Sequence, residues 1–282
     1  MNARRVKKNS KIFVVQFILY AVLIFSLFMS FLPIIISLFN SFKNDFEIMT
    51  NVFAPPTEFD FWGFAKAWSD ISKNLWNGVF VALVAGIFNT VLGSLIAYIF
   101  QQKQFIGKEF LYKFYIFIML TPSLVGLPIQ YSLVNDLHLI NNYFSIWLTS
   151  LAGGQVGALF LFRTFLGQHP GAVYEAARID GANDVQIYLR ISIPLAFPIM
   201  MLNFINVFSG VYNDYFWPSL VIKDPDLQPV MAVLKRVSDS YLVKDLRVPY
   251  AMCLICSLPL IVTTAISMKY FFSGDFAAGI KL

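Results

Sequence analysis

Long hydrophobic runs separated by short polar segments make up most of this chain. A helix needs roughly 20 apolar residues to cross the hydrocarbon core of a membrane, and six runs come close to or exceed that length. We therefore predict an all-α membrane protein with six membrane-spanning helices. Their expected bounds are 12–40, 76–100, 112–133, 143–167, 191–217 and 250–273.

The polar segments between these runs hold no more than about 35 residues each, too few to fold as independent domains. Residues 1–282 are therefore expected to form a single transmembrane domain. The first run follows a cluster of basic residues, as a signal peptide would. Its apolar core extends from Ile12 to Phe39, beyond the roughly 7–15 residues of a signal-peptide core. We interpret it as a helix that stays in the membrane.

Composition supports a membrane protein and argues against several other classes. Charged residues make up 13% of the 282 residues, whereas soluble domains carry about 25%. The formal charge of +5 comes from basic residues scattered over loops, so no nucleic-acid partner is expected. The chain lacks the phosphate-binding motif G-x-x-x-x-G-K-[ST]. His138 and His169 have no Cys or His at ligand spacing, so neither a metal nor a cofactor is expected.

The distribution of charge between alternate loops predicts the orientation. With a cytoplasmic N-terminus, the inner segments hold 13 of the 21 basic residues and 5 of the 16 acidic residues. The excess of Lys and Arg favours both termini inside. All five tryptophans then fall near the outer surface, where an interfacial aromatic belt would place them.

The predicted second helix is built for close packing. It carries a small residue at every third or fourth position, which lets neighbouring backbones approach closely. This small-residue stripe consists of Ala82, Gly86, Thr90, Gly93 and Ala97.

Apart from Asp214, about a turn from the outer end of the fifth predicted helix, no charged residue lies deep in a predicted span. Ion-coupled transporters normally keep charged residues in the membrane. A transporter without them takes its energy from elsewhere.

A short polar island interrupts the hydrophobic pattern before the fifth helix. Pro170 suits the first position of a helix that continues to Ile179, and Glu175 and Arg178 are spaced to pair. Gly181 is placed to end that helix in a left-handed conformation. Asn183 can cap a second helix with Gln186 as its reciprocal partner. We predict a helix–Gly–helix elbow on the inner side.

Two interpretations of the elbow follow from its residues. An amphipathic helix lying on the membrane surface would carry Lys or Arg and bulky apolar residues. This helix instead offers Ala176 and Ala177, which keep its surface low enough to enter a groove, and one fixed charge at Glu175. Docking onto a soluble partner is the interpretation that these residues favour.

The elbow resembles the EAA loop in the permease subunits of bacterial ABC importers. The resemblance rests on Glu175-Ala176-Ala177, on Gly181 four residues later, and on Ile191-Ser192-Ile193-Pro194. Asp180-Gly181-Ala182 and Pro198 extend it toward the carbohydrate-uptake branch.

Other segments resemble the same branch along nearly the whole chain. The run from Thr121 to Tyr131, continuing to Asn142, is one of them. Phe53–Thr57, Asn77 and the tail Gly274–Lys281 are similar to the shorter, six-helix subunit of maltose-type importers. Two departures are the run Tyr212-Asn213-Asp214-Tyr215, where the family usually has a Trp-Asn-Glu/Asp-Phe-like run, and Leu282 in place of a final Gly.

The resemblance implies a type I importer permease fold whose coupling helix docks into a cleft on a cytoplasmic ATPase. It implies a multi-pass subunit of the bacterial cell membrane that translocates a sugar, most simply an oligosaccharide, and catalyses nothing itself. The implied partners are a second homologous permease, two cytoplasmic ABC ATPase subunits, an extracytoplasmic sugar-binding protein and membrane lipid. The implied coupling residues are Glu175, Ala176, Ala177, Asp180 and Gly181.

Polar residues along the fifth helix form a second candidate site. Asn203, Asn206, Gly210 and Asn213 share one face, with Asp214 beside them at the outer end. An uncharged polar stripe suits the hydroxyls of a sugar pathway, and interhelical hydrogen bonding explains it equally well.

Two other functions stay open at this point. The same machinery could import a different solute such as an amino acid or phosphate, although charged cargo favours fixed charges along the path. A self-sufficient channel or secondary carrier is the second alternative. On the outer side, loops 41–75 and 218–248 hold nine of the 16 acidic residues, which fits either a landing surface for a binding protein or a solvated acidic face.

Overall fold

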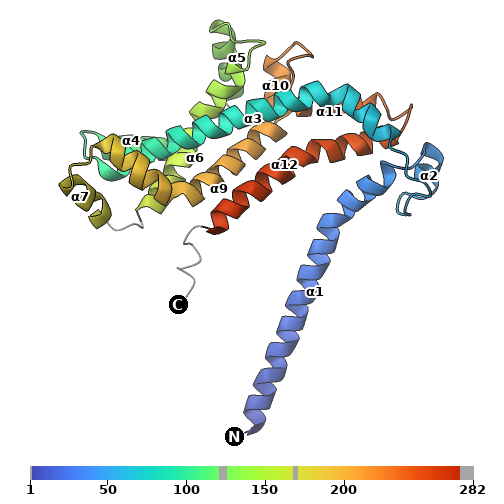
Figure 1. Cartoon of the computed structure of the whole chain (residues 1–282), viewed down its shortest axis with the longest axis horizontal. Helices are drawn as coiled ribbons and strands as arrows, with labels where there is room; N and C mark the ends of the chain where they lie inside the picture. The colour runs from blue at the N-terminus through green and yellow to red at the C-terminus, as the bar shows by residue number, and fades with distance from the viewer. Residues whose placement is uncertain (1, 121–125, 168–170, 274–282) are drawn as a thin grey trace. The chain divides into compact units, whose positions relative to one another are not determined.

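The computed structural model describes residues 2–120, 126–167 and 171–273, and within these ranges it describes the side chains of residues 15 to 271. Within these ranges all regular elements are helices (Figure 1). The chain divides into two compact units, Met1–Asp70 with Val237–Ile255 and Ile71–Arg236 with Cys256–Leu282. Helices α3 (Trp62–Gln102) and α12 (Arg247–Ser273) contribute residues to both units.

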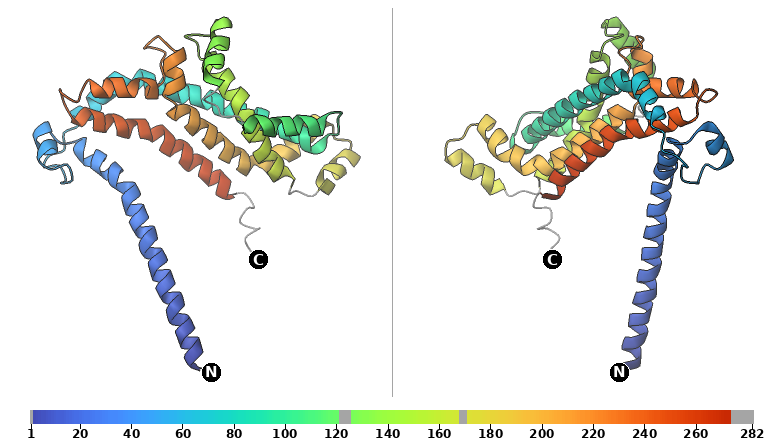
Figure 2. Two further views of the ribbon diagram at one scale, coloured as in Figure 1. Left: turned by 180° about the vertical axis from the view of Figure 1, so that it is seen from behind. Right: turned by 45° about the vertical axis from the view of Figure 1, so that its right-hand side comes forward.

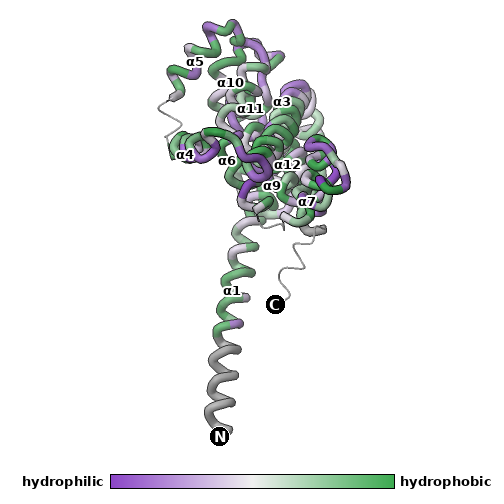
Figure 3. Tube along the Cα trace, turned by 90° about the vertical axis from the view of Figure 1, so that its left-hand side faces the viewer, coloured by the Kyte–Doolittle hydropathy of each residue, from purple (hydrophilic) through white to green (hydrophobic). Residues whose placement is uncertain are grey.

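Five helical segments of the described residues are long and apolar enough to cross a membrane. Two of them are parts of α1 (Asn2–Asn40) and α12, two coincide with α3 and α6 (Phe144–Leu166), and the segment Asp184–Asn213 includes α9 (Ile193–Asn213). Residues 15–40 of α1 are mostly hydrophobic (Figure 3), and none of their apolar window is buried within the chain. The all-α membrane fold is therefore confirmed, while the count of six spans and their orientation stay predictions.

The third predicted span, residues 112–133, corresponds to two shorter helices. They are α4 (Lys108–Met119) and α5 (Leu127–Asp136), and residues 121–125 between them lie outside the described ranges. Pro128 occupies the first turn of α5, where its missing N–H costs nothing. Pro122 and the start of the Thr121–Tyr131 run are also outside the described residues.

The second span is longer than its hydropathy predicts, because α3 begins at Trp62 rather than near residue 76. The added turns are amphipathic: Ala67, Ile71 and Leu75 recur at every fourth position and are buried. On the polar side Lys66 and Asp70 form an ion pair of 2.8 Å at i,i+4. The charges that lower the mean hydropathy of this stretch therefore stabilise the helix.

The fifth predicted span ends at Asn213 rather than at residue 217. Asp214 is extended, and its carboxylate accepts the N–H groups of Phe216 and Trp217 at 2.9 and 3.2 Å. This cap begins a separate short helix, α10 (Phe216–Val221). Trp217 is buried, with its indole N–H donated to the carbonyl of Ser145, so it does not join an interfacial belt.

The core of the second unit lies where α3, α6 and α9 pack together (Figure 2). The small-residue stripe of α3 makes these contacts, as predicted. A Cβ added at Gly93 would lie 2.5 Å from the Cβ of Ala158 on α6, and one at Gly86 would lie 2.9 Å from the ring of Phe204 on α9. Close approach of the backbones therefore requires glycine at both positions.

In the first unit, a buried lysine connects the end of α1 to the loop that follows the short helix α2 (Asp45–Thr50). Lys43 is 1% exposed, and its ammonium group donates to the side-chain oxygen of Asn40 at 3.0 Å and to the carbonyls of Asn51 and Val52. Burial lowers the pKa of Lys43. Helix α2 begins just after this lysine, and the carboxylate of Asp45 accepts the N–H of Leu246 at 2.8 Å.

Candidate functional site

The elbow forms as the sequence predicts. Helix α7 (Gly171–Ile179) is followed by Gly181 at φ = 81°, a left-handed conformation that glycine adopts without steric cost. Helix α8 (Asp184–Ile187) then begins with a complete capping box between Asn183 and Gln186, at 2.9 Å in both directions. The prediction that Pro170 starts the first helix falls outside the described residues.

A π-helical turn joins the elbow to the spanning helix. This turn, η2 (Tyr188–Ser192), follows α8 directly and continues into α9. Because no loop intervenes, α8, η2 and α9 form one continuous helical segment. Single π-turns of this kind often lie at functional sites.

Aromatic residues and one ion pair clamp the elbow to the end of α3. Tyr98 of α3, Tyr174 of α7, Ile187 and Tyr188 form a buried cluster, and burial raises the pKa of Tyr174 so that its hydroxyl stays neutral. The hydroxyls of Tyr188 and Ser94 lie 2.7 Å apart.

Lys103, just beyond the end of α3, and Asp184, in α8, form the ion pair, at 2.6 Å. None of these contacts was predicted from the sequence. The available signal was the pair of tyrosines Tyr174 and Tyr188, in and just after the elbow.

The opposite face of the elbow is exposed. Glu175, Ala176, Asp180 and Gly181 are exposed and Ala177 is half-buried in the tyrosine cluster. Large apolar side chains join them, because Ile179 is 86% exposed and Val185 is 65% exposed. Large apolar side chains exposed on a short helix of a polar loop are typical of a surface that contacts a protein partner.

The predicted pair between Glu175 and Arg178 does not form among the described ion pairs. Arg178 instead donates to the carbonyl of Gln102 at the end of α3, at 3.5 Å. The carboxylate of Glu175 therefore remains available on the exposed face of the elbow.

The polar stripe of α9 divides into two kinds of residue. Asn203 is buried, and its amide donates to the hydroxyl of Thr90 on α3 at 3.0 Å, which is the interhelical bond of the second interpretation. Asn206 and Asn213 are exposed, and Asn213 donates to the carbonyl of Ser209 on its own helix. These residues lie on the same face of α9, but Asn203 is buried whereas Asn206 and Asn213 are exposed.

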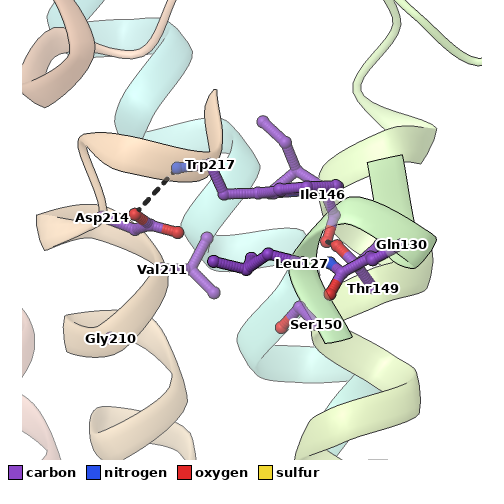
Figure 4. A pocket seen from close by; sticks show the side chains of 9 residues that line it. All are labelled: Leu127, Gln130, Ile146, Thr149, Ser150, Gly210, Val211, Asp214 and Trp217. Atoms are coloured by element: carbon purple, nitrogen blue, oxygen red, sulfur yellow. Dashed lines mark hydrogen bonds between the residues drawn. The ribbon is translucent and has the colours of Figure 1, made fainter. Parts of the chain in front are cut away.

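A cavity of about 270 Å³ lies beside the C-terminal end of α9 (Figure 4). Its walls come from α5, α6, α9 and α10, and the sequence singled out Gly210 and Asp214 among the lining residues. Gln130, Thr149 and Trp217 were not predicted to line a site, because three separate helices bring them together.

Residues 89–274 match the family model described as the inner membrane component of binding-protein-dependent transport systems. The chain is 30% identical over 196 residues to a diacetylchitobiose uptake system permease protein of Streptomyces coelicolor, covering 69% of this chain and 65% of that one. It is 26% identical over 208 residues to an sn-glycerol-3-phosphate transport system permease protein of Brucella abortus, covering 72% of each chain.

A solved structure has a similar fold. It is a chain of a bacterial ABC transporter involved in the import of the acidic polysaccharide alginate, with a TM-score of 0.77 at 23% identity over 92% of this chain and 96% of that one. This chain therefore belongs to the family of membrane components of binding-protein-dependent transport systems. It is the permease, a multi-pass membrane subunit that translocates a solute, and the family implies ATPase, substrate-binding and second-permease partners.

Proposed function

We propose that this permease imports an oligosaccharide and that its elbow receives the driving force from two cytoplasmic ABC ATPase subunits. The observation that carries the proposal is the two-sided elbow. One side is fixed to α3 by the tyrosine cluster and the Lys103–Asp184 pair, and the other side exposes Glu175 and apolar groups. A partner that pushes on the exposed side moves α3 and α9 together.

The residues of the elbow have separate roles in this proposal. Glu175 supplies a charge for the cleft of the ATPase, and Ala176 and Ala177 keep the helix narrow. Asp180 adds a second exposed charge, and Gly181 holds the turn that sets the angle between α7 and α8. Movement of a packed, rigid joint can switch the pathway between inward and outward access.

A neutral sugar is the cargo that the polar groups support best. The described spanning helices offer amides and hydroxyls along α9 and beside the cavity, with Asp214 as the single charged residue of that cavity. The Streptomyces relative is named for a disaccharide, while the Brucella relative is named for a phosphate ester. An anionic cargo would favour basic groups, and the cavity lining has none.

We further propose that residues 1–282 act as one transmembrane domain with six spans and both termini inside. The outer loops would then receive an extracytoplasmic sugar-binding protein. In the first unit, a cavity of about 270 Å³ is lined by Glu47, Glu58, Asp60 and Arg247 among others. Its carboxylates suit a basic surface on the binding protein, and a merely solvated acidic face is the competing explanation.

The experiment is reconstitution of the complete transporter in lipid vesicles. The vesicles contain this chain with its second permease and ATPases, and the binding protein is added outside. ATP-dependent uptake is measured for glucose-, xylose- and N-acetylglucosamine-based di- to tetrasaccharides, and for glycerol 3-phosphate. Uptake of a saccharide only with ATP and binding protein supports the proposal. Uptake of glycerol 3-phosphate alone, or of any solute without ATPase, contradicts it.

A further inference from the structure

We infer that this chain carries its own subsite for one sugar ring, in the cavity between α5, α6, α9 and α10. The inference rests on the proposed function, because it assigns a binding site for the same cargo. The cavity volume of about 270 Å³ is just below the roughly 300–1,000 Å³ typical of small-molecule sites. It therefore holds a unit the size of one ring rather than a whole oligosaccharide.

Three polar groups in the cavity wall have hydrogen-bonding capacity to spare. Among the described residues, the amide of Gln130 and the hydroxyl of Ser150 have no hydrogen-bond partner. The carboxylate of Asp214 uses Oδ1 for both N–H groups of α10, which leaves Oδ2 to accept from a ligand. A pyranose presents hydroxyls that both donate and accept, and these groups offer both functions.

The geometry of Asp214 is fixed before a ligand arrives. Its two accepted bonds orient the side chain, and Figure 4 shows it across the cavity from Gln130 and Thr149. A group held in place by its own protein loses little entropy on binding. The capping bonds account for the orientation of Asp214, while the half-buried side chains of Gln130 on α5 and Ser150 on α6 remain free to bond a ligand.

Apolar groups complete a surface suited to a sugar. The indole of Trp217 is fixed by its bond to Ser145 at 3.2 Å, and Leu127 and Val211 line the same space. Sugar rings present C–H faces as well as hydroxyls, so a site with an aromatic wall and a few convergent polar groups matches both surfaces. A lone carboxylate without a basic residue in the lining disfavours anionic cargo.

Gly210 provides the route to a test because it forms part of the cavity wall. A Cβ built at this position meets no atom within 4 Å. A larger side chain can therefore project into the cavity without displacing the protein. Replacement of glycine within a helix by Ala or Leu also raises helix propensity by up to about 1 kcal/mol, so uptake is expected to fall while helix stability is kept or increased.

The experiment uses the reconstituted complete transporter and the saccharide set described above. Gly210→Leu should transport at least tenfold more slowly than wild type with an unchanged or higher melting temperature, and the smaller change Gly210→Ala should give an intermediate rate. Asp214→Asn keeps an oxygen for the α10 cap and removes the charge, and we expect uptake to fall at least fivefold. Asp136→Asn, an exposed carboxylate at the end of α5, is the matched control and should transport as wild type does.

The outcomes separate the two proposals. Saccharide uptake by wild type that is unchanged in Gly210→Leu and Asp214→Asn overturns the subsite and leaves the proposed function standing. Failure of wild type to import any saccharide overturns both. If Gly210→Leu melts at a lower temperature, Gln130→Leu decides, because that change breaks no hydrogen bond within the described chain: reduced uptake supports the subsite and normal uptake overturns it.

Discussion

The ammonium group of Lys103 lies 2.6 Å from a carboxylate oxygen of Asp184, joining the end of α3 to the first turn of α8. Both side chains are partly exposed, at 41% and 52%. A pair of this kind contributes only about 0.2–1 kcal/mol to stability. Its role is positional, because it holds the elbow against the end of α3.

Reversing one charge should therefore weaken coupling more than folding. We expect Lys103→Glu to lower the amount of solute transported per ATP hydrolysed at least threefold, with a melting temperature within a few degrees of wild type. Exchanging the two residues, Lys103→Asp with Asp184→Lys, should restore the ratio. A coupling ratio that is unchanged in the single variant would remove the pair from the transmission path.

A second prediction concerns the exposed carboxylate of the elbow. Glu175→Lys should weaken recovery of the ATPase subunits from detergent extracts at least tenfold, because it places the opposite charge on the docking face. Glu109→Lys makes the same change at a residue that is 69% exposed on α4, and it should leave recovery intact. Equal recovery for both variants and wild type would contradict the docking role.

The third prediction tests the close packing of α3 against α6. Gly93→Ala places a Cβ 2.5 Å from that of Ala158, so the helices must separate. We expect a loss of about 1–3 kcal/mol, measured as a lower melting temperature of the purified complex. Gly157→Ala on α6 is the control, since its Cβ meets nothing within 4 Å. A melting temperature for Gly93→Ala at or above that of the control would show that the contact is not tight.

The two halves of the polar stripe should respond differently to leucine. Asn203→Leu leaves the hydroxyl of Thr90 without its partner, and an orphaned buried group costs about 1–3 kcal/mol. Asn203→Leu should therefore lower the melting temperature of the purified complex. Asn206 is exposed, so Asn206→Leu should retain stability and reduce uptake if this residue lines the pathway. Normal uptake with reduced stability in Asn206→Leu would assign it to packing.

The fifth prediction tests the orientation of the loops. Single cysteines at Thr57 and Ser240, both exposed, are introduced after replacement of Cys253 and Cys256. Each should react with a membrane-impermeant reagent from outside the cell, and added binding protein should slow the reaction at least fivefold. Labelling only from the cytoplasmic side would reverse the topology, and labelling without protection would leave the loops as a solvated face.

The features that the sequence could predict are those determined by residues close together in the chain. Gly181 and the Asn183–Gln186 cap act within four residues, so the elbow followed from the chain alone. Asn203 and Asn206 share a helical face, yet only contact with α3 decides which of them is buried. The walls of the cavity and the tyrosine cluster join residues dozens of positions apart, and no periodicity reports such contacts.

Charged residues made hydropathy a poor guide to helix ends in two opposite ways. The charged turns of α3 before residue 76 were assigned to a loop, although burial of Ala67, Ile71 and Leu75 stabilises them as helix. The reverse happened after Asn213, where Asp214 ends one helix and begins another inside an apolar run. In both places a specific side-chain contact outweighed average hydrophobicity.

Because α8, η2 and α9 follow one another without a loop, movement at one end of the segment can be transmitted to the other end. The segment's 30 residues, Asp184–Asn213, correspond to a length of about 45 Å at 1.5 Å per residue. Tilting such a rod by about 10°, less than the roughly 15° seen in subunit rotations, carries its far end through about 8 Å. The elbow and the cavity lie at opposite ends of that rod. If the elbow receives the driving force, as proposed, a small movement there becomes a displacement comparable to a sugar ring at the far end of α9.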